Sequence, residues 1–211
     1  SMFGRYFPTA IAHGGYSVEE IITLNFMATD GLYGLIIGVL STYIIIFVIF
    51  SSFLQETGAV NFFINLSNSI AGHFSGGPAK VAVVSSGFIG SLSGSSAANV
   101  VTTGSFTIPM MKRSGIRGEV AGAIESVAST GGALLPPVMG SAAFLMAELT
   151  GIDYLDILMA ALVPALLFYC GLMAQVHFGA VKDGLEPEES EGVSALQTFR
   201  EGGHHLLPLI A

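Results

Sequence analysis

The sequence predicts an all-α polytopic membrane protein that combines transmembrane helices with a re-entrant helical hairpin and a broken helix. The first observation is composition, because 52% of the residues are hydrophobic, 10% are charged and the mean hydropathy is +0.71, values typical of membrane proteins. The second is a pair of apolar stretches, at 79–110 and 118–148, each interrupted midway. A helix needs about 20 consecutive apolar residues to cross the bilayer core, so neither stretch is an ordinary span.

Composition also narrows the classes of function. The formal net charge is −8, but five of the 15 acids lie between Asp183 and Glu191, and no basic tract indicates a nucleic-acid partner. The single cysteine, Cys170, lies in an apolar stretch, which leaves no ligands for a disulfide or a cysteine metal site. The sequence contains no HExxH or GxSxG motif and no intramembrane aspartate pair, so we expect no enzyme.

Residues 1–30 are expected to form an extracytoplasmic or interfacial segment. Ser17-Val18-Glu19-Glu20 resembles a capping box, and the helix that it opens is too short and too polar to cross the bilayer. The order of residues at the start does not match a signal peptide, and both ends read as an excerpt from a longer membrane chain. Residues 31–55 are predicted to be a transmembrane helix, because Leu32–Leu54 carries no charge.

Residues 58–75 predict an amphipathic helix that lies in the membrane interface. Apolar residues, including Val60, Phe63 and Ile64, alternate at helical spacing with Asn61 and Asn65. The sequence Gly76-Gly77-Pro78 then ends this helix before the first interrupted stretch.

Residues 79–110 are predicted to be a re-entrant hairpin of two half-helices. The run Gly90–Ser96 interrupts the stretch, and each half is then about 20 Å long, too short to cross alone. Irregular backbone at this depth is tolerated only inside protein or beside water, and in transporters it holds ions or anionic substrates. An alternative is that the small residues only permit close helix packing. The candidate residues at the tip are Ser91, Ser93, Gly94, Ser95, Ser96 and Asn99.

Residues 118–148 are predicted to be a transmembrane helix that breaks midway. The candidate site residues at the break are Ser129, Thr130, Gly131, Gly132, Pro136 and Pro137. Tandem prolines remove two backbone donors, and we expect carbonyls near Thr130 to face the hairpin tip. Alanine at both glycines is expected to favour closure of the break without loss of folding. A simple proline kink is the alternative.

Glu125 and Lys80 are charged residues that fall inside these stretches. Glu125 lies two turns into the broken helix, and an intramembrane acid is a functional candidate, although it could instead reach water or pair with Arg117 or Lys80. Lys80 is expected to be an interfacial anchor rather than a ligand. The scattered histidines have no metal-ligand spacing.

The remaining segments fix the expected orientation. Residues 155–178 predict a transmembrane helix, 179–205 a cytoplasmic linker and 206–211 the start of another span. Lys112, Arg113 and Arg117 form the densest basic cluster, so the positive-inside rule places the base of the hairpin in the cytoplasm.

Two motifs resemble a known family. The run GGPAKVAVVSSGFIGSLSGSSAANVVTTGSFTIPMMKRSG, followed by ASTGGALLPPVMG, resembles the large membrane subunit of tripartite ATP-independent periplasmic (TRAP) transporters. The upstream runs FGRYFPTAIAHGGYS and STYIIIFVIF are similar to the fused-permease branch that works with TAXI-type solute-binding proteins. The resemblance covers essentially the whole chain.

The resemblance implies one half of an inverted-repeat, elevator-type transporter in the inner (cytoplasmic) membrane of a bacterium or archaeon. It implies a sodium-coupled importer of small organic acids, with sodium as the coupling ion and no other cofactor, and with a periplasmic TAXI-type binding protein and the missing second half of the permease as partners. Without that half the chain should not transport. The alternative is a carboxylate transporter, exporter or channel of related fold that needs no binding protein. The implied sodium ligands are Ser93, Gly94, Ser95, Asn99, Thr130 and Gly131.

Overall fold

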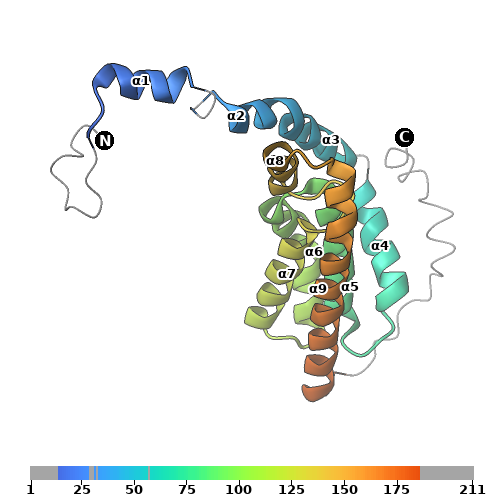
Figure 1. Cartoon of the computed structure of the whole chain (residues 1–211). Coiled ribbons are helices and arrows are strands. Elements are labelled where there is room, and N and C mark those ends of the chain that lie inside the picture. The colour runs from blue at the N-terminus through green and yellow to red at the C-terminus, as the bar shows by residue number, and fades with distance from the viewer. Residues whose placement is uncertain (1–13, 29–30, 32, 57, 186–211) are drawn as a thin grey trace.

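The structure is a computed structural model that describes residues 14–28, 31, 33–56 and 58–185, and it contains helices and no strand in those ranges (Figure 1). The prediction of an all-α protein is therefore confirmed for this part of the chain. The elements are α1 (Val18–Phe26), α2 (Leu35–Val39), a π-helical segment η2 (Leu40–Ile44), α3 (Ile45–Glu56), α4 (Ala59–Ala71), α5 (Gly77–Ser93), α6 (Ser96–Arg113), α7 (Gly118–Gly132), α8 (Ser141–Thr150) and α9 (Tyr154–Lys182). The predicted span at 206–211 and most of the predicted linker at 179–205 lie outside the described residues.

Helix α1 lies apart from the other helices (Figure 1). Its predicted capping box is present, because the backbone N–H of Glu20 donates to Ser17 Oγ at 3.1 Å and Glu20 Oε2 accepts from the backbone N–H of Ser17 at 2.8 Å. This reciprocal pair satisfies two backbone donors at the start of the helix. Local sequence alone thus sets where α1 begins.

The helical stretch from α2 to α3 changes from α-helix to π-helix and back again. The π-helical segment η2 follows α2 directly and leads into α3, so the sequence predicted one helix where the structure has three consecutive helical segments. Within η2, the hydroxyl of Ser41 donates to the carbonyl oxygens of Ile37 at 2.9 Å and Gly38 at 3.1 Å. Such turns occur mostly as short bulges inside helices.

Helices α5 and α6 form an antiparallel hairpin with a two-residue turn. Gly94 ends α5 in the left-handed region at φ 60°, where its N–H donates to the carbonyl of Gly90, and Ser95 caps α6. The predicted interruption at Gly90–Ser96 is too wide, because α5 continues as far as Ser93. The small residues before the turn are mostly buried against neighbouring helices, and packing overrides their weak helix propensity.

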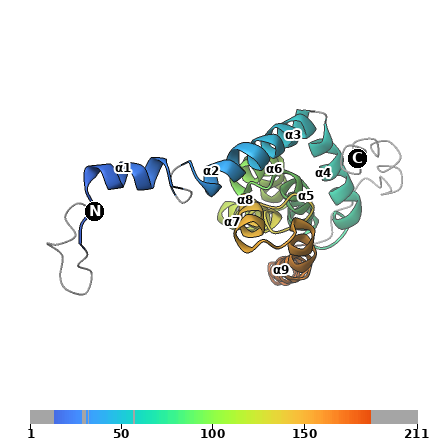
Figure 2. The ribbon, with the colours of Figure 1, turned by 45° about the horizontal axis from the view of Figure 1, so that its top comes forward.

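Helix α5 lies at the centre of the helices α4, α6, α7 and α9, and it contacts all four (Figure 2). One buried apolar cluster joins α5, α6, α7 and α9 through residues such as Val83, Met111 and Leu172. A second cluster packs Phe62, Phe63 and Leu66 of α4 against Ile89 and Leu92 of α5. The apolar face of α4 therefore lies largely on the hairpin.

Helix α9 is the membrane-span candidate. Within the described residues it alone has the length and the composition to cross a bilayer, with a mean hydropathy of 2.3 over its most apolar stretch. Its outward side chains are apolar and exposed, among them Leu155, Met159, Val163 and Leu167. A stripe of this kind is typical of a surface that contacts lipid or another subunit.

Candidate ion-binding site

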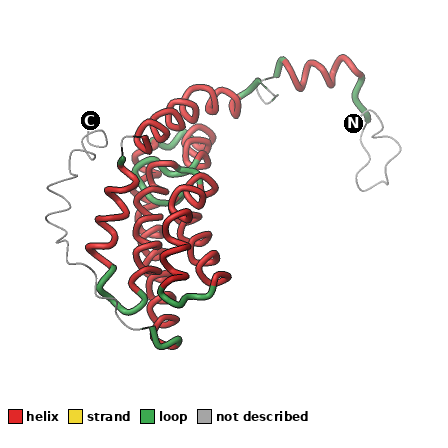
Figure 3. Tube along the Cα trace, turned by 180° about the vertical axis from the view of Figure 1, so that it is seen from behind, coloured by secondary structure: helices red, strands yellow, loops and turns green. Residues whose placement is uncertain are grey.

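The hairpin tip lies against the loop that follows α7 and leads to α8; Figure 3 shows loops gathered at the end of the helices. This loop, residues 133–140, is the predicted break: α7 stops at Gly132 and α8 starts at Ser141. The backbone N–H of Val138 donates to the carbonyl of Ser91 at 3.1 Å. A Cβ at Gly94 would overlap the carbonyl oxygen of Met139. The structure thus brings together the two breaks, Ser91–Asn99 and Ser129–Pro137, that lie far apart in the sequence.

Glycines allow α5 and α7 to touch directly beneath the tip. A Cβ added to Gly90 would come within 2.6 Å of the Cα of Gly132, and the reverse substitution gives the same distance. Gly131 lies elsewhere, because a Cβ there would overlap the ring of Phe168 in α9. Consequently Gly132 faces the hairpin, whereas the implied ligand Gly131 faces α9.

Asn99 is buried beside this contact between α5 and α7, with 0% of its surface exposed. Its side-chain Nδ2 donates to the carbonyl oxygen of Ser86 at 2.8 Å and lies against Gly90. The other end of the amide, Oδ1, is the buried side-chain polar atom that has no hydrogen-bond partner among the described residues. A buried carbonyl oxygen without a partner costs about 1–3 kcal/mol, so its retention points to a ligand.

The serines predicted for the tip lie in the turn or in the helix ends beside it, and most bond locally. The hydroxyl of Ser91 donates to the carbonyl of Phe88 at 2.8 Å. Ser93 Oγ accepts from the N–H of Ser95 at 3.5 Å, and Ser95 Oγ accepts from the N–H of Ala98 at 3.4 Å. Ser96, the first residue of α6, is half-buried. These hydroxyl oxygens keep lone pairs that a cation can use.

The α7 side of the predicted site differs from expectation. Thr130 is exposed and its hydroxyl donates to the carbonyl of Ser126 at 2.8 Å. The carbonyl oxygens of Thr130 and Gly131 accept from the N–H groups of Ala133 and Leu134, so these carbonyls bond within their own turn instead of standing free beside the tip. A helix rotates by about 100° per residue, and this rotation turns Gly132 rather than its two predecessors toward α5.

The two predicted prolines lie in the loop that packs against the hairpin tip. Pro136 and Pro137, joined by a cis peptide bond, are part of residues 133–140. The hydroxyl of Tyr154, at the start of α9, donates to the carbonyl oxygens of Pro137 at 3.2 Å and Val138 at 2.6 Å. Tyr154 therefore anchors the loop against which the tip packs, and nothing in the sequence pattern singled it out.

The surroundings of Glu125, a candidate residue, differ from those that the sequence suggested. It is fully buried at the centre of α7, and it accepts hydrogen bonds from hydroxyls of Ser86, Thr103, Thr107 and Ser129. The suggested pairing with Arg117 or Lys80 is wrong. A signal was present, because Asn99, Thr103 and Thr107 recur every four residues and so share one face of α6.

Lys80 lies at the opposite end of the hairpin from the tip. Only 5% of its surface is exposed; its Nζ is 3.0 Å from His177 Nδ1 and 5.1 Å from the centre of the Phe74 ring. It is therefore a buried residue at the hairpin base, which corrects the expectation of an interfacial anchor.

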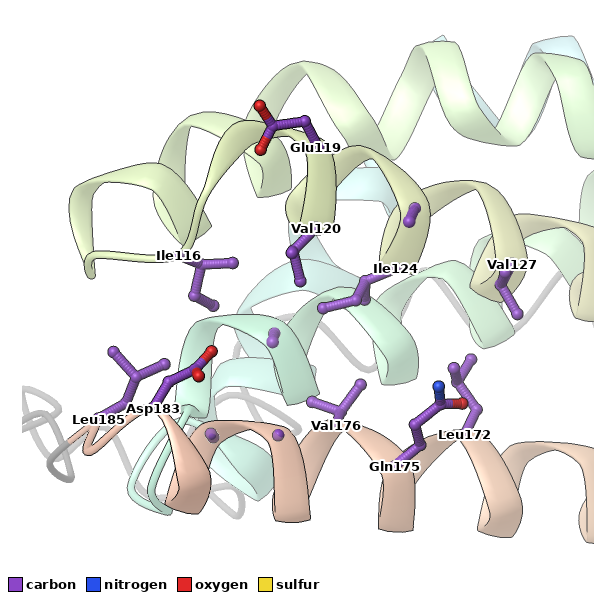
Figure 4. A pocket seen from close by; sticks show the side chains of 14 residues that line it. Ile116, Glu119, Val120, Ile124, Val127, Leu172, Gln175, Val176, Asp183 and Leu185 are labelled. Carbon is purple, nitrogen blue, oxygen red and sulfur yellow. The ribbon is translucent and has the colours of Figure 1, made fainter.

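A groove of about 390 Å³ lies between α7 and α9, toward the hairpin base (Figure 4). Its walls are apolar side chains, among them Val120, Ile124 and Val176, with Glu119 and Asp183 at one end. Among its lining residues no set of polar groups converges on one point, so the candidate ion site is the hairpin tip.

Comparison with known proteins assigns nearly the whole chain to one family. Residues 5–210 match the family described as "Tripartite ATP-independent periplasmic transporter, DctM component". A "C4-dicarboxylate TRAP transporter large permease protein DctM" from Pseudomonas aeruginosa is 34% identical over 134 residues, which are 64% of this chain and 31% of that protein.

Two further relatives extend the match. A protein of the same description from Vibrio cholerae is 28% identical over 199 residues, 94% of this chain and 42% of its own length. An "Isethionate TRAP transporter permease protein DctMQ" from Oleidesulfovibrio alaskensis is 26% identical over 180 residues, 85% of this chain and 27% of its own length. The chain thus spans well under half the length of these relatives.

Proposed function

Because the chain belongs to the family of the DctM component, the large permease, of tripartite ATP-independent periplasmic transporters, we propose that it is part of a sodium-coupled importer of organic acids. The family is one of solute-transporter components rather than enzymes. Two relatives carry C4-dicarboxylate in their names and one carries isethionate. Both are small organic anions, which favours a carboxylate or a similar acid as the substrate here.

The observation that carries sodium coupling is the buried, unpartnered Oδ1 of Asn99 beside the tip. Sodium is a hard cation that takes oxygen ligands, and unwound backbone in transporters commonly supplies them. We assign the ion to the layer formed by Asn99, the turn at Ser93–Ser95 and the loop 133–140. This set omits the side chain of Thr130 and Gly131, which face away from the hairpin.

Ser129 also stands outside the proposed ion site. It is buried, but its hydroxyl donates to Glu125 Oε1 at 3.1 Å, so it is committed to the acid. The ligands that we propose therefore come mainly from the hairpin and from the loop backbone, and α7 contributes its end rather than its side chains.

The membrane arrangement follows from charge. Lys112 and Arg113 end α6 and are exposed, and the positive-inside rule assigns this end to the cytoplasm. The hairpin then enters and leaves the inner membrane from the cytoplasmic side, with its tip inside the bilayer. The remaining length of the permease would supply the inverted second half and the elevator movement, and a periplasmic TAXI-type protein would deliver the substrate.

Uptake by the full-length permease, reconstituted in lipid vesicles with its binding protein, tests the proposal. We expect accumulation of a labelled C4-dicarboxylate under an inward sodium gradient and little under an equal potassium gradient. Equal uptake with both cations would reject sodium coupling.

Omission of the binding protein separates the alternative function. Sodium-driven uptake that persists without any binding protein would favour an independent carboxylate transporter, and passive flux in both directions would favour a channel.

A further inference from the structure

We propose that Glu125 is a reversible proton-binding site at the interface between the hairpin and α7. Its carboxyl group is fully buried where three helices meet. The hydroxyls around it come from all three: Ser86 from α5, Thr103 and Thr107 from α6, and Ser129 from α7 itself. This inference goes beyond the proposed function, because Glu125 contacts none of the proposed sodium ligands.

Within the described residues Glu125 forms no ion pair. On α5, Lys80 contacts His177 instead, and on α6 the cations Lys112 and Arg113 are exposed at the far end. On α9 the nearest titratable group is the phenol of Tyr169, whose O–H donates to the carbonyl of Ala128 at 2.8 Å and not to the Glu125 carboxyl.

The rest of α7 offers no counter-charge either, since Glu119 at its start is an exposed acid. A buried acid without a basic partner is costly in a protein interior, and intramembrane acids are commonly functional. Packing alone would be met by an apolar side chain at position 125.

In the ionised form the carboxylate has four donors. Oε1 accepts from Ser86 at 2.9 Å, from Ser129 at 3.1 Å and from Thr103, and Oε2 accepts from Thr107 at 2.5 Å. Hydrogen bonds from several hydroxyls stabilise a buried charge without a cation.

In the protonated form the added hydrogen also finds a partner. When Oε2 gains a proton from water, the charge of the carboxyl falls from −1 to zero and the new O–H points to Thr107 Oγ1. Thr107 can accept it because its own hydroxyl proton has a second acceptor, the carbonyl of Thr103, at 3.0 Å. Thr103 has the same alternative, the carbonyl of Asn99 at 2.8 Å.

Both protonation states therefore keep every polar hydrogen paired with no movement of a heavy atom. Buried polar groups are rarely left unpaired, and here the rotation of the Thr107 hydroxyl toward the carbonyl of Thr103 is enough to serve the protonated state. The hydroxyl cage of Ser86, Thr103, Thr107 and Ser129 around Glu125 accommodates a proton with no movement of a heavy atom. A metal ion would have to displace hydroxyls that already contact the carboxyl.

Infrared difference spectroscopy of the full-length permease in lipid tests this inference. On acidification we expect the C=O stretching band of a protonated carboxyl to appear reversibly in the wild type. The band should be lost in Glu125→Gln, which keeps the size of the side chain. Ser126→Ala removes an exposed hydroxyl from the same helix and should leave the band intact. A band that stays in Glu125→Gln, or no pH-dependent band at all, would overturn the proposal.

A second variant covers the case in which Glu125→Gln does not fold. Glu125→Asp keeps a carboxyl but shortens its reach, so the same band should appear at an altered frequency; an unaltered band belongs to another residue and rejects the assignment.

Repeating the titration in sodium and in potassium separates the two proposals. If sodium abolishes the band at low pH, the cage binds a metal ion and the proton site is wrong. If the Glu125 band persists in both salts but transport ignores sodium, only the proposed sodium coupling fails.

Discussion

Gly90 of α5 and Gly132 of α7 meet backbone to backbone, since a Cβ on either would come within 2.6 Å of the other's Cα. This contact fixes the hairpin against the end of α7 just below the tip. It also overturns the expectation that alanine at both Gly131 and Gly132 would leave the chain as well folded. At Gly131 the added Cβ would overlap the Phe168 ring, so helix propensity is not the deciding term.

Gly132→Ala should lower the stability of the permease by roughly 1–3 kcal/mol, because overpacking forces the two helices apart. Gly122→Ala is the matched control, since it lies in the same helix and has no atom within 4 Å of the added Cβ. That control should be neutral or stabilise by up to about 1 kcal/mol. Thermal unfolding of both variants in the same detergent measures the difference. Equal unfolding temperatures would mean that the helices do not touch at these glycines.

Asn99→Leu should abolish sodium-specific stabilisation of the permease, because it removes the buried oxygen that we assign to the ion. Ser93→Val should weaken that stabilisation, since it removes a hydroxyl at the turn. Thr130→Val is the control, because the Thr130 side chain is exposed and bonds within α7. A thermal-shift titration with sodium against potassium gives the readout. Loss in Thr130→Val with retention in Asn99→Leu would reverse our assignment.

Tyr154→Phe should loosen the loop 133–140 while the helices stay folded. The substitution removes the hydroxyl that donates to Pro137 and Val138, a loss of about 1 kcal/mol. We expect weaker sodium binding with normal membrane insertion, measured by the same titration. Tyr43→Phe, at an exposed tyrosine, should bind sodium as the parent does. Parent-like sodium binding in Tyr154→Phe would show that the anchor does not shape the site.

Cysteine labelling in a Cys170→Ser background tests the re-entrant arrangement. His73 and Arg113 flank the hairpin and are exposed, which makes them better probes than the buried Lys80. Cysteines at these two positions should react from the same side of the membrane, and a cysteine at the exposed Glu148 should react from the other. Opposite sidedness of positions 73 and 113 would replace the hairpin with a crossing helix.

The stability of the first turn of α1 should depend on pH through the protonation of Glu20. Hydrogen bonds from the backbone N–H and then from the side chain of Ser17 lower the pKa of the Glu20 carboxyl from its ordinary value of 4.5. Because the pKa of Glu20 is lowered in the folded helix, the cap contributes its full stability above the ordinary pKa of 4.5. This stability is lost as the pH falls through the lowered pKa. The backbone N–H of Ser17, which donates to Glu20 Oε2, should therefore lose protection from amide exchange in acid, measured relative to its intrinsic exchange rate at each pH. The variant Glu20→Gln should show no such loss, and an unchanged protection factor in the parent would exclude the capping role.

Local chemistry determined where the helices begin and end. Gly94 accepts the left-handed conformation that ends α5, the run from Gly132 to Pro137 stops α7, and Ser17 with Glu20 starts α1. These features depend on a few consecutive residues, so the sequence sufficed to predict the hairpin turn, the break and the cap. Composition likewise sufficed for the all-α class.

Only the tertiary structure decided which side chains meet. The sequence named Thr130 and Gly131 as ligands, yet the rotation of α7 turns Gly132 toward the hairpin and Thr130 outward. It likewise offered Glu125 a basic partner, whereas packing against α5 and α6 surrounds this acid with hydroxyls. The reason is geometric. A helix presents a new direction at every residue, and the face that turns inward is selected by the shapes of neighbouring helices that lie far away in the chain.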